Sequence, residues 1–172
     1  MTLQDRRTQP PCTADERTTL TTMLDFQRDT LAMKCEGLTA EQLKDRAVGP
    51  SALSLLGLVR HAAEVERGWF RNVINGESSR SPWTPVGSTD WADFDVDDAD
   101  DADVAEAFAV WREECRRARA IVEAADSLDV TGHIDEEVFS LRYVLVHMIE
   151  EYARHNGHAD LLRERIDGAT GE

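Results

Sequence analysis

FSLRYVLVHMIEEYARHNGHADLLRERIDG, residues 139–168, carries the strongest helical pattern in the chain and three of its five histidines. His155 continues the apolar face of this pattern, and Glu151 lies one turn before it. His147 and His158 lie on the same side of the expected helix. A buried carboxylate or imidazole needs a hydrogen bond, an opposite charge or a metal ion. The apolar face itself recurs at steps of three and four: Leu141, Leu145, Met148, Tyr152, Ala159, Leu162 and Ile166.

Length and composition favour one helical domain. The chain has 172 residues, of which 41% are apolar and 6% aromatic, and this content is enough for a single core. No run of β-branched residues alternates with polar ones, so the expected fold class is all-α. We expect residues 1–12, which are polar and end in two prolines, to form a flexible arm, and 13–172 to form the single domain.

Charge and cysteine usage restrict the partners. A net charge of −15 would repel nucleic acid and anionic membrane surfaces, so neither is expected to bind. The three cysteines are widely spaced and predict neither a disulfide framework nor a zinc ribbon. No signal peptide or spanning segment is recognisable, so we expect a cytoplasmic protein.

Three further helices and a connector are predicted before residue 126. Thr13 with Glu16 fits a capping box for a first helix that ends near Gly37, and Thr39 with Gln42 opens a short connector. The second long helix should begin after Ser51 or Ser54 and stop at residues 75–76, and the third should span 104–125.

Residues 77–103 lack helical periodicity and are strongly acidic. They do not match the ligand spacing of a calcium-binding EF-hand loop. We interpret the segment as a solvated connection that crosses the length of the molecule, and residues 126–139 as a linker. Four long helices with one long connection predict a four-helix bundle.

Two of the long helices offer metal ligands at mid-length. His61 comes from the second, and Glu151 and His155 come from the fourth. Two imidazoles and a carboxylate suit zinc, with nickel or another first-row ion as alternatives, and three protein ligands leave one position open. The chain lacks Glu-x-x-His on two helices, which argues against a di-iron centre.

Each histidine also has a plain structural interpretation. His61 suits a hydrogen-bonded core residue, and His147 and His158 suit caps or partners of nearby carboxylates. His133 is expected to be an exposed linker residue. The spacing of these residues leaves both the metal site and the structural interpretation open.

Two segments carry a family resemblance. PSALSLLGLVRHAAEVERGWF (50–70) and LRYVLVHMIEEYARHNGHADLLRERIDG (141–168) resemble the signature helices of the DinB superfamily, in its actinobacterial branch near the mycothiol-dependent maleylpyruvate isomerases. The resemblance extends over 15–168. It implies an up-down-down-up four-helix bundle with the long crossover between helices two and three.

The resemblance also implies ligands and an activity. The family places a histidine in helix two and a His-x-x-x-His pair in helix four, whose first member is a glutamate in the isomerase-like branch; here these positions are His61, Glu151 and His155. The usual glutamine after Arg-Gly is replaced by His158. The implied function is a metal-dependent transferase or isomerase that uses a low-molecular-weight thiol such as mycothiol, while the catalytic residues are unknown.

Other functions remain open. The metal could stabilise a non-catalytic stress-response module, or the chain could be a dimerisation module, so a homodimer is also left open. If the protein is an enzyme, its partner is a small-molecule substrate. We expect Trp69, Tyr152 and His158 to border the substrate cavity, with plain core packing as the alternative for both aromatic residues.

Overall fold

A computed structural model describes residues 5, 7–84 and 92–171, and shows a mostly helical chain. The arm residues 1–4 and 6 and the crossover residues 85–91 lie outside the described ranges. The elements, in chain order, are α1 (Glu16–Cys35), α2 (Ala40–Lys44), α3 (Leu55–Glu66), the π-helical segment η1 (Arg67–Ile74), α4 (Asp101–Ala124), β1 (Thr131–Ile134), β2 (Glu137–Ser140) and α5 (Leu141–Asp167).

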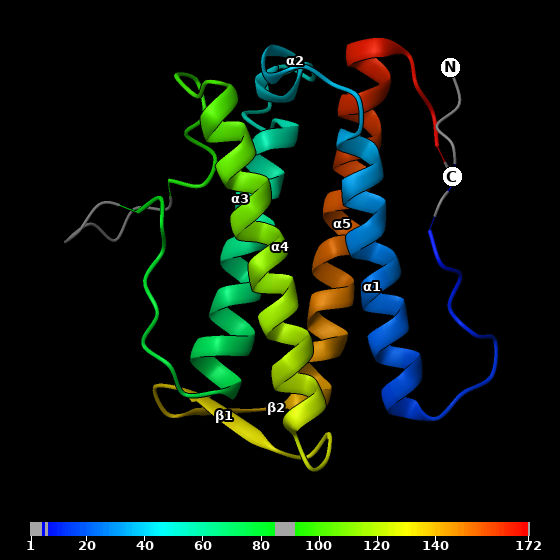
Figure 1. The fold of residues 1–172 in the computed structure, drawn as a ribbon, viewed down its shortest axis with the longest axis vertical. Helices are drawn as coiled ribbons and strands as arrows, with labels where there is room; N and C mark the ends of the chain where they lie inside the picture. The colour runs from blue at the N-terminus through cyan, green and yellow to red at the C-terminus, as the bar shows by residue number, and fades with distance from the viewer. Residues whose placement is uncertain (1–4, 6, 85–91, 172) are drawn as a thin grey trace.

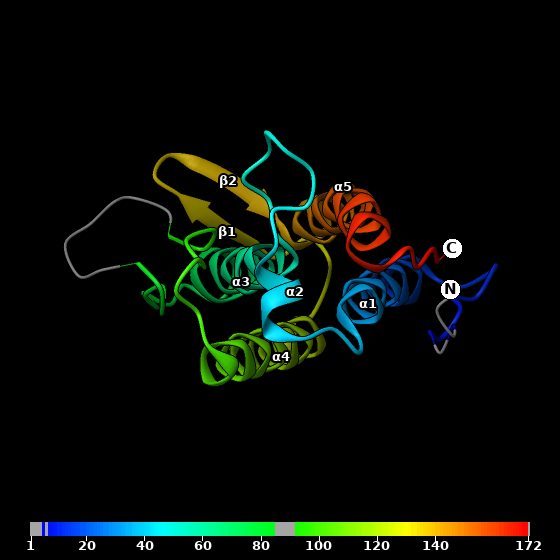
Figure 2. The same ribbon diagram turned by 90° about the horizontal axis from the view of Figure 1, so that it is seen from above.

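The long helices lie side by side along the long axis of the molecule (Figure 1). α1 and α5 run in one direction, and α3, η1 and α4 run in the opposite one. Viewed along the axis, α2 crosses one end, and α1 lies beside α5 while α3 lies beside α4 (Figure 2). The crossover returns the chain from the end of η1 to the start of α4, so α3 and α4 point the same way.

The mostly helical class is confirmed, but residues 126–139, expected to be a linker, contain most of a β-hairpin that closes the other end. β1 pairs antiparallel with β2 from Thr131 opposite Ser140 to Ile134 opposite Glu137. Asp135 takes a positive φ of 50° in the turn. Four-residue strands are too short to be distinguished from a linker by sequence pattern, and they form here because the hairpin packs on η1.

The hairpin lies very close to η1. A Cβ atom on Gly132 would lie 1.8 Å from the backbone oxygen of Val73, which no larger residue can accept. This contact fixes the hairpin against the helix that continues from α3, and thereby fixes the start of α5.

Two helix starts differ from expectation. α1 begins after Asp15, whose carboxylate accepts a hydrogen bond from Thr18 N at 3.0 Å, and not after Thr13. α4 begins three residues early because Asp100 and Asp103 form a capping box. In both cases an aspartate that also favours the helix dipole caps the first turn.

The other predicted caps are confirmed. Thr39 and Gln42 form the capping box of α2, and Ser54 caps α3. α5 begins after Ser140 and ends at Gly168, which takes a left-handed φ of 73°. The ends of the helix that carries Glu151 and His155 were therefore predictable from local sequence.

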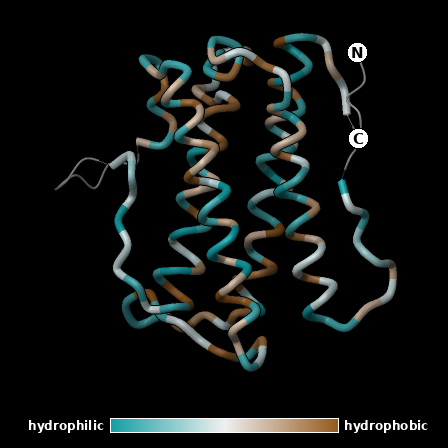
Figure 3. The backbone as a smooth tube through the Cα atoms, viewed as in Figure 1, coloured by the Kyte–Doolittle hydropathy of each residue, from teal (hydrophilic) through white to brown (hydrophobic). Residues whose placement is uncertain are grey.

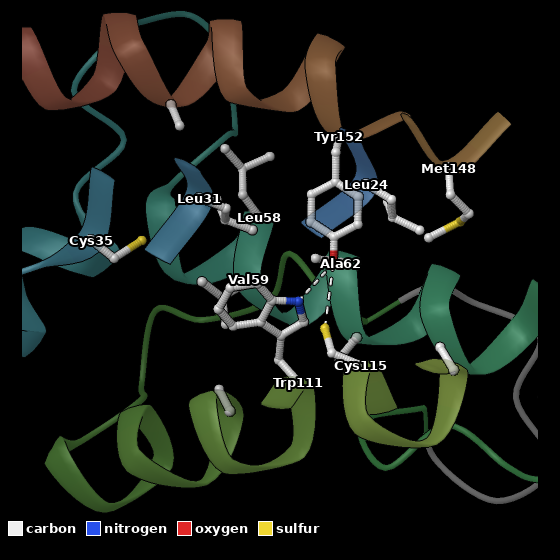
Figure 4. Packing of buried hydrophobic residues seen from close by; sticks show 14 of the residues in the cluster. Leu24, Leu31, Cys35, Leu58, Val59, Ala62, Trp111, Cys115, Met148 and Tyr152 are labelled. Atoms are coloured by element: carbon white, nitrogen blue, oxygen red, sulfur yellow. Dashed lines mark hydrogen bonds between the residues drawn. The ribbon is translucent and has the colours of Figure 1, made fainter. Parts of the chain in front are cut away.

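The core lies between the four long helices. Hydrophobic and hydrophilic residues alternate along each of them (Figure 3), as expected for helices that bury one face. Leu24 and Leu31 of α1, Leu58 of α3 and Met148 of α5 are almost fully buried and gather around Tyr152 (Figure 4).

The N-terminal arm contacts α1 at Arg7. Its guanidinium carbon lies 4.5 Å from the ring centroid of Phe26, and its Nη1 donates to Thr30 Oγ1 at 3.0 Å. The described part of the arm therefore lies along α1.

Candidate metal centre

Three side chains from two helices converge at mid-length between α3 and α5. The ligand atoms of His61, Glu151 and His155 lie within 4.8 Å of one another. His61 Nε2 lies 3.0 Å and His155 Nε2 lies 3.1 Å from the same oxygen, Glu151 Oε1. Among the described residues, this is the one group of three or more metal-type ligands.

The helical geometry explains this convergence. Glu151 and His155 are four residues apart on α5, so their side chains lie one above the other on one face. α3 runs antiparallel to α5 and contacts it, which brings His61 opposite this pair. The rings of His61 and His155 meet edge to face with centroids 4.8 Å apart.

The acidic crossover contributes a residue that the sequence did not indicate as functional. Asp93 is 2% exposed, and its Oδ2 lies 2.7 Å from His61 Nδ1. The expectation of a solvated connection is therefore wrong for this part of the crossover. The only available signal was the alternation of acidic and apolar residues around Phe94 and Val96.

Neighbouring contacts hold this part of the crossover on α3. The Phe94 ring stacks on His61 at 5.2 Å, and Arg60 Nη1 donates to the backbone oxygen of Asp95 at 2.9 Å. A Cβ atom on Gly57 would lie 2.7 Å from Phe94, so glycine permits the close approach. Val96 is buried beside them. The contact between Asp93 and His61 thus belongs to a packed interface.

Both ring nitrogens of His61 face carboxylate oxygens, and this arrangement requires a positive charge at or beside the ring. A carboxylate only accepts hydrogen bonds, so the nitrogen facing Asp93 must carry the proton. In neutral His61 the other nitrogen has a lone pair, yet it faces the Glu151 oxygen, which is also an acceptor. Such a pair repels unless a proton or a cation lies between the two atoms. The donor set therefore fits either an imidazolium or a bound metal ion.

The pKa values follow the same arrangement. Burial lowers the pKa of His61, but hydrogen bonds to Asp93 and Glu151 outweigh burial and raise it overall. Burial raises the pKa of Glu151, and the two histidines outweigh this and lower it. Burial and the charge of His61 lower the pKa of His155. The arrangement thus favours a positive charge on His61 over one on His155.

The space at the centre is small. A cavity of about 10 Å³ is lined in part by His61, Glu151, His155 and the Tyr152 ring. This volume holds about one water-sized guest. A substrate must therefore approach from the partly exposed side of the centre.

The predicted substrate residues lie in three different settings. Tyr152 lines the small cavity, and its hydroxyl accepts a hydrogen bond from Trp111 (Figure 4). His158 Nδ1 lies 3.3 Å from His155 Nδ1. Trp69 contacts His147, one turn before Glu151. Their role in substrate binding stays a prediction. His133 is exposed, as expected, but lies on a strand.

A second carboxylate cluster, absent from the sequence interpretation, lies deeper between the same helices. Glu66 is fully buried and accepts two hydrogen bonds from Arg28, both at 2.7 Å, and one from the Tyr152 hydroxyl at 2.9 Å. Trp111 Nε1 donates to that hydroxyl at 2.7 Å. This network joins all four long helices.

A larger cavity lies away from the ligand cluster. It has a volume of about 540 Å³ and lies between α1 and α4, with Met33, Phe108 and Arg112 in its walls. Because the described residues place their one group of metal-type ligands between α3 and α5, this cavity and the candidate metal centre lie in different parts of the molecule.

The cysteines are unsuited to act at the centre. Cys35 and Cys115 are buried, and burial raises the pKa of Cys35 to about 12. Burial and the nearby Glu66 also raise the pKa of Cys115 above its usual range. Cys12 is exposed on the arm. A thiolate nucleophile would therefore have to come from outside the protein.

Comparison with known proteins identifies the family. A family model described as mycothiol-S-transferase matches residues 19–168, which include all three converging residues and Asp93. No curated protein matches the chain. Among helices in the described ranges, none combines the length and apolar character needed to cross a bilayer. The chain therefore belongs to the mycothiol-S-transferase family, a DinB-like family, in agreement with the resemblance of its two helices.

Proposed function

We propose that this protein is a divalent-metal-dependent transferase or isomerase that uses a low-molecular-weight thiol such as mycothiol. The observation that carries the proposal is the convergence of two imidazoles and one carboxylate from facing helices in a chain of this family. The proposed ligands are His61, Glu151 and His155. The opposed acceptors at His61 and Glu151 support a cation at this position.

The donor set favours zinc among the available ions. Imidazole and carboxylate ligands suit zinc, and nickel or another first-row ion accepts the same donors. Three protein ligands leave one position for an incoming group. The Asp93 carboxylate on the outer nitrogen of His61 is the kind of contact that orients a histidine ligand and raises its basicity.

The chemistry requires an activated thiol. A divalent ion held by His61, Glu151 and His155 would act as a Lewis acid that lowers the pKa of a thiol placed beside it, so that the thiol would release its proton to solvent at neutral pH and become a stronger nucleophile. The sulfur then bonds to an electrophilic carbon of the second substrate, whose leaving group departs with its electron pair. Asp93 keeps His61 in the tautomer that turns its lone pair towards the ligand position. The residues of the centre thus orient the reaction and do not supply the nucleophile.

The proposal includes the family fold. We interpret the parallel pair α3 and α4 and the antiparallel flanking helices α1 and α5 as the up-down-down-up four-helix bundle, with the hairpin added at one end. Thiol chemistry also suits the reducing cytoplasm.

A structural metal is the alternative. The three residues would join α3 to α5 through an ion, and such a link stabilises a helical protein without catalysis. This alternative describes a metal-binding stress-response or dimerisation module. It predicts metal binding without any thiol-dependent rate.

The test combines metal analysis with a thiol-transfer assay. Purified protein should contain about one divalent ion per chain and should conjugate mycothiol to an electrophile only when both ion and thiol are present. His61→Ala should lose both the ion and the rate, while His133→Ala, on the exposed strand, should keep both. A protein that holds its ion but is inactive with every thiol and electrophile tested supports the structural alternative. Absence of metal from protein purified without chelators and offered zinc refutes the site.

A further inference from the structure

Four aromatic rings gather next to the metal centre. We call Trp69, Phe139, Tyr143 and His147 the aromatic shelf. The Trp69 ring meets Phe139 at 5.2 Å and His147 at 4.7 Å, both edge to face. Tyr143 stacks on His147 with ring planes 9° apart. The shelf is built from η1, β2 and α5.

The shelf is continuous with the centre along α5. Tyr143, His147, Glu151 and His155 follow one another at steps of four residues, so they form one stripe on the helix. Four residues advance an α-helix by about 6 Å. The shelf therefore begins about one helical turn from the proposed ligand Glu151.

The π-helical segment aligns Trp69 with this stripe. In an α-helix, a residue eight positions after His61 would be rotated from it by roughly 80°. η1 begins at Arg67 and its wider turn, with i→i+5 hydrogen bonds, rotates less per residue. Trp69 therefore stays closer to the side of α3 that carries His61, facing α5.

The polar atoms of the shelf distinguish it from the aromatic core. In the core, Trp111 Nε1 and the Tyr152 hydroxyl bind each other at 2.7 Å. Within the described ranges, by contrast, no hydrogen bond is made by the polar side-chain atoms of Trp69, Tyr143 or His147. Tyr143 is 51% exposed, and the other two are half-buried. Trp69 and Phe139 also pack against the core, but the shelf keeps part of its surface exposed through Tyr143, Trp69 and His147. Amphipathic rings with an apolar body and a free polar edge suit a site that faces a ligand.

We infer that the aromatic shelf binds the electrophilic substrate, and that this substrate is planar and conjugated or aromatic. The inference rests on the proposed function for the reaction, since the cavity at the centre holds only about one water-sized guest and the second substrate must lie outside it. Flat π surfaces favour offset or edge-to-face contact with another ring. The shelf carries few polar atoms, so it suits a flat ring better than the hydroxyl-rich part of a sugar-containing thiol.

Binding of an unreactive pair of probes tests the inference without catalysis. Nitrobenzene and nitrocyclohexane have similar size but differ in planarity, and their dissociation constants can be measured by protein-detected NMR titration. Nitrobenzene should bind more tightly and should shift the indole N–H signal of Trp69. Trp69→Leu and Tyr143→Leu should each weaken nitrobenzene binding by about 3- to 10-fold.

Phe108→Leu is the matched control, because Phe108 lies in the wall of the large cavity between α1 and α4. It should leave nitrobenzene affinity unchanged. The inference is overturned if both probes bind equally, if the shelf variants bind nitrobenzene normally, or if only Phe108→Leu weakens binding. It is also overturned if the shelf variants weaken binding of mycothiol alone and spare nitrobenzene.

The same variants separate this inference from the proposed function. His61→Ala should bind nitrobenzene normally, because the shelf does not contain the metal ligands. If the protein binds nitrobenzene at the shelf but shows no thiol-transfer activity, the proposed function is refuted, while the shelf remains a binding site for planar rings. Thiol transfer to 1-chloro-2,4-dinitrobenzene with a KM that Trp69→Leu leaves unchanged retains the function and refutes the shelf.

Discussion

Glu66 and Glu151 are two carboxylates in the same inter-helix region, but their partners differ. Glu66 is fully buried and receives a two-pronged contact from Arg28 and a hydrogen bond from Tyr152. Glu151 keeps 15% of its side chain exposed and contacts His61 and His155. The first cluster extends to α1 and α4, while the second joins α3 to α5 and is partly exposed.

The partners decide what each carboxylate can do. A guanidinium stays charged at every accessible pH. Burial lowers the pKa of Arg28, but the charge and hydrogen bonds of Glu66, together with the neighbouring Cys115 and Tyr152, outweigh burial and raise it. That cluster is closed to other cations. An imidazole can lose its proton near neutral pH and then offer a lone pair to a metal ion. In both clusters a carboxylate contacts basic side chains between helices. The clusters differ because a guanidinium keeps its proton, whereas an imidazole can lose one, and this difference separates a structural cluster from a candidate binding site.

The largest expected effect is on the structural cluster. Arg28→Met leaves Glu66 buried without its counter-charge, which should lower the free energy of unfolding by about 3–5 kcal/mol. Urea unfolding of the metal-free protein measures this. Arg28→Met combined with Glu66→Leu should recover most of the loss, because no buried charge remains. A loss below about 1 kcal/mol in the single variant would show that the pair contributes little.

The second prediction concerns the proposed metal ligands. His155→Ala should weaken zinc binding by at least about 100-fold, since it removes a ligand and not merely its support. Its free energy of unfolding without metal should fall less than that of Arg28→Met. Competition with a chromophoric chelator measures the affinity. His133→Ala is the control, and equal loss in both variants would contradict the assignment.

The third prediction concerns the crossover contact. Asp93→Asn removes the charge that holds His61 and should weaken zinc binding by about 10- to 100-fold. Asp95→Asn is a matched control, because Asp95 is exposed and contributes its backbone oxygen to Arg60. The same competition assay applies. If Asp93→Asn bound zinc with wild-type affinity, the contact between Asp93 and His61 would only help to pack the crossover on α3 and would not support metal binding.

The smallest effect is a pH dependence. Protons compete with the metal for His61, whose pKa in the metal-free protein is raised, so zinc affinity should fall as pH decreases through that pKa. The decrease should approach about tenfold per pH unit once the histidine is protonated. The guanidinium of Arg28 stays charged over the same range, because its pKa is raised above an already high value. Chelator competition between pH 6 and pH 8, corrected for protonation of the chelator, measures the zinc affinity at each pH. A zinc affinity that does not change with pH would contradict the role of His61 as a ligand.

Local sequence determined the helices and their ends where the signal lies within a few residues. The capping box of Thr39 and Gln42 and the boundaries of α5 at Ser140 and Gly168 follow from hydrogen bonds within one turn. The i, i+4 spacing of Glu151 and His155 placed both on one helical face, and the family resemblance indicated His61 as their partner.

Only the tertiary structure decided which residues surround His61, Glu151 and His155. Asp93 is one aspartate among many in the crossover, and it differs from the others because Phe94 and Val96 pack that segment on α3. The pairing of Arg28 with Glu66 joins residues 38 positions apart, and the hairpin depends on its contact with η1. Helix caps need only local hydrogen bonds, whereas these features need surfaces that exist only after the chain has folded.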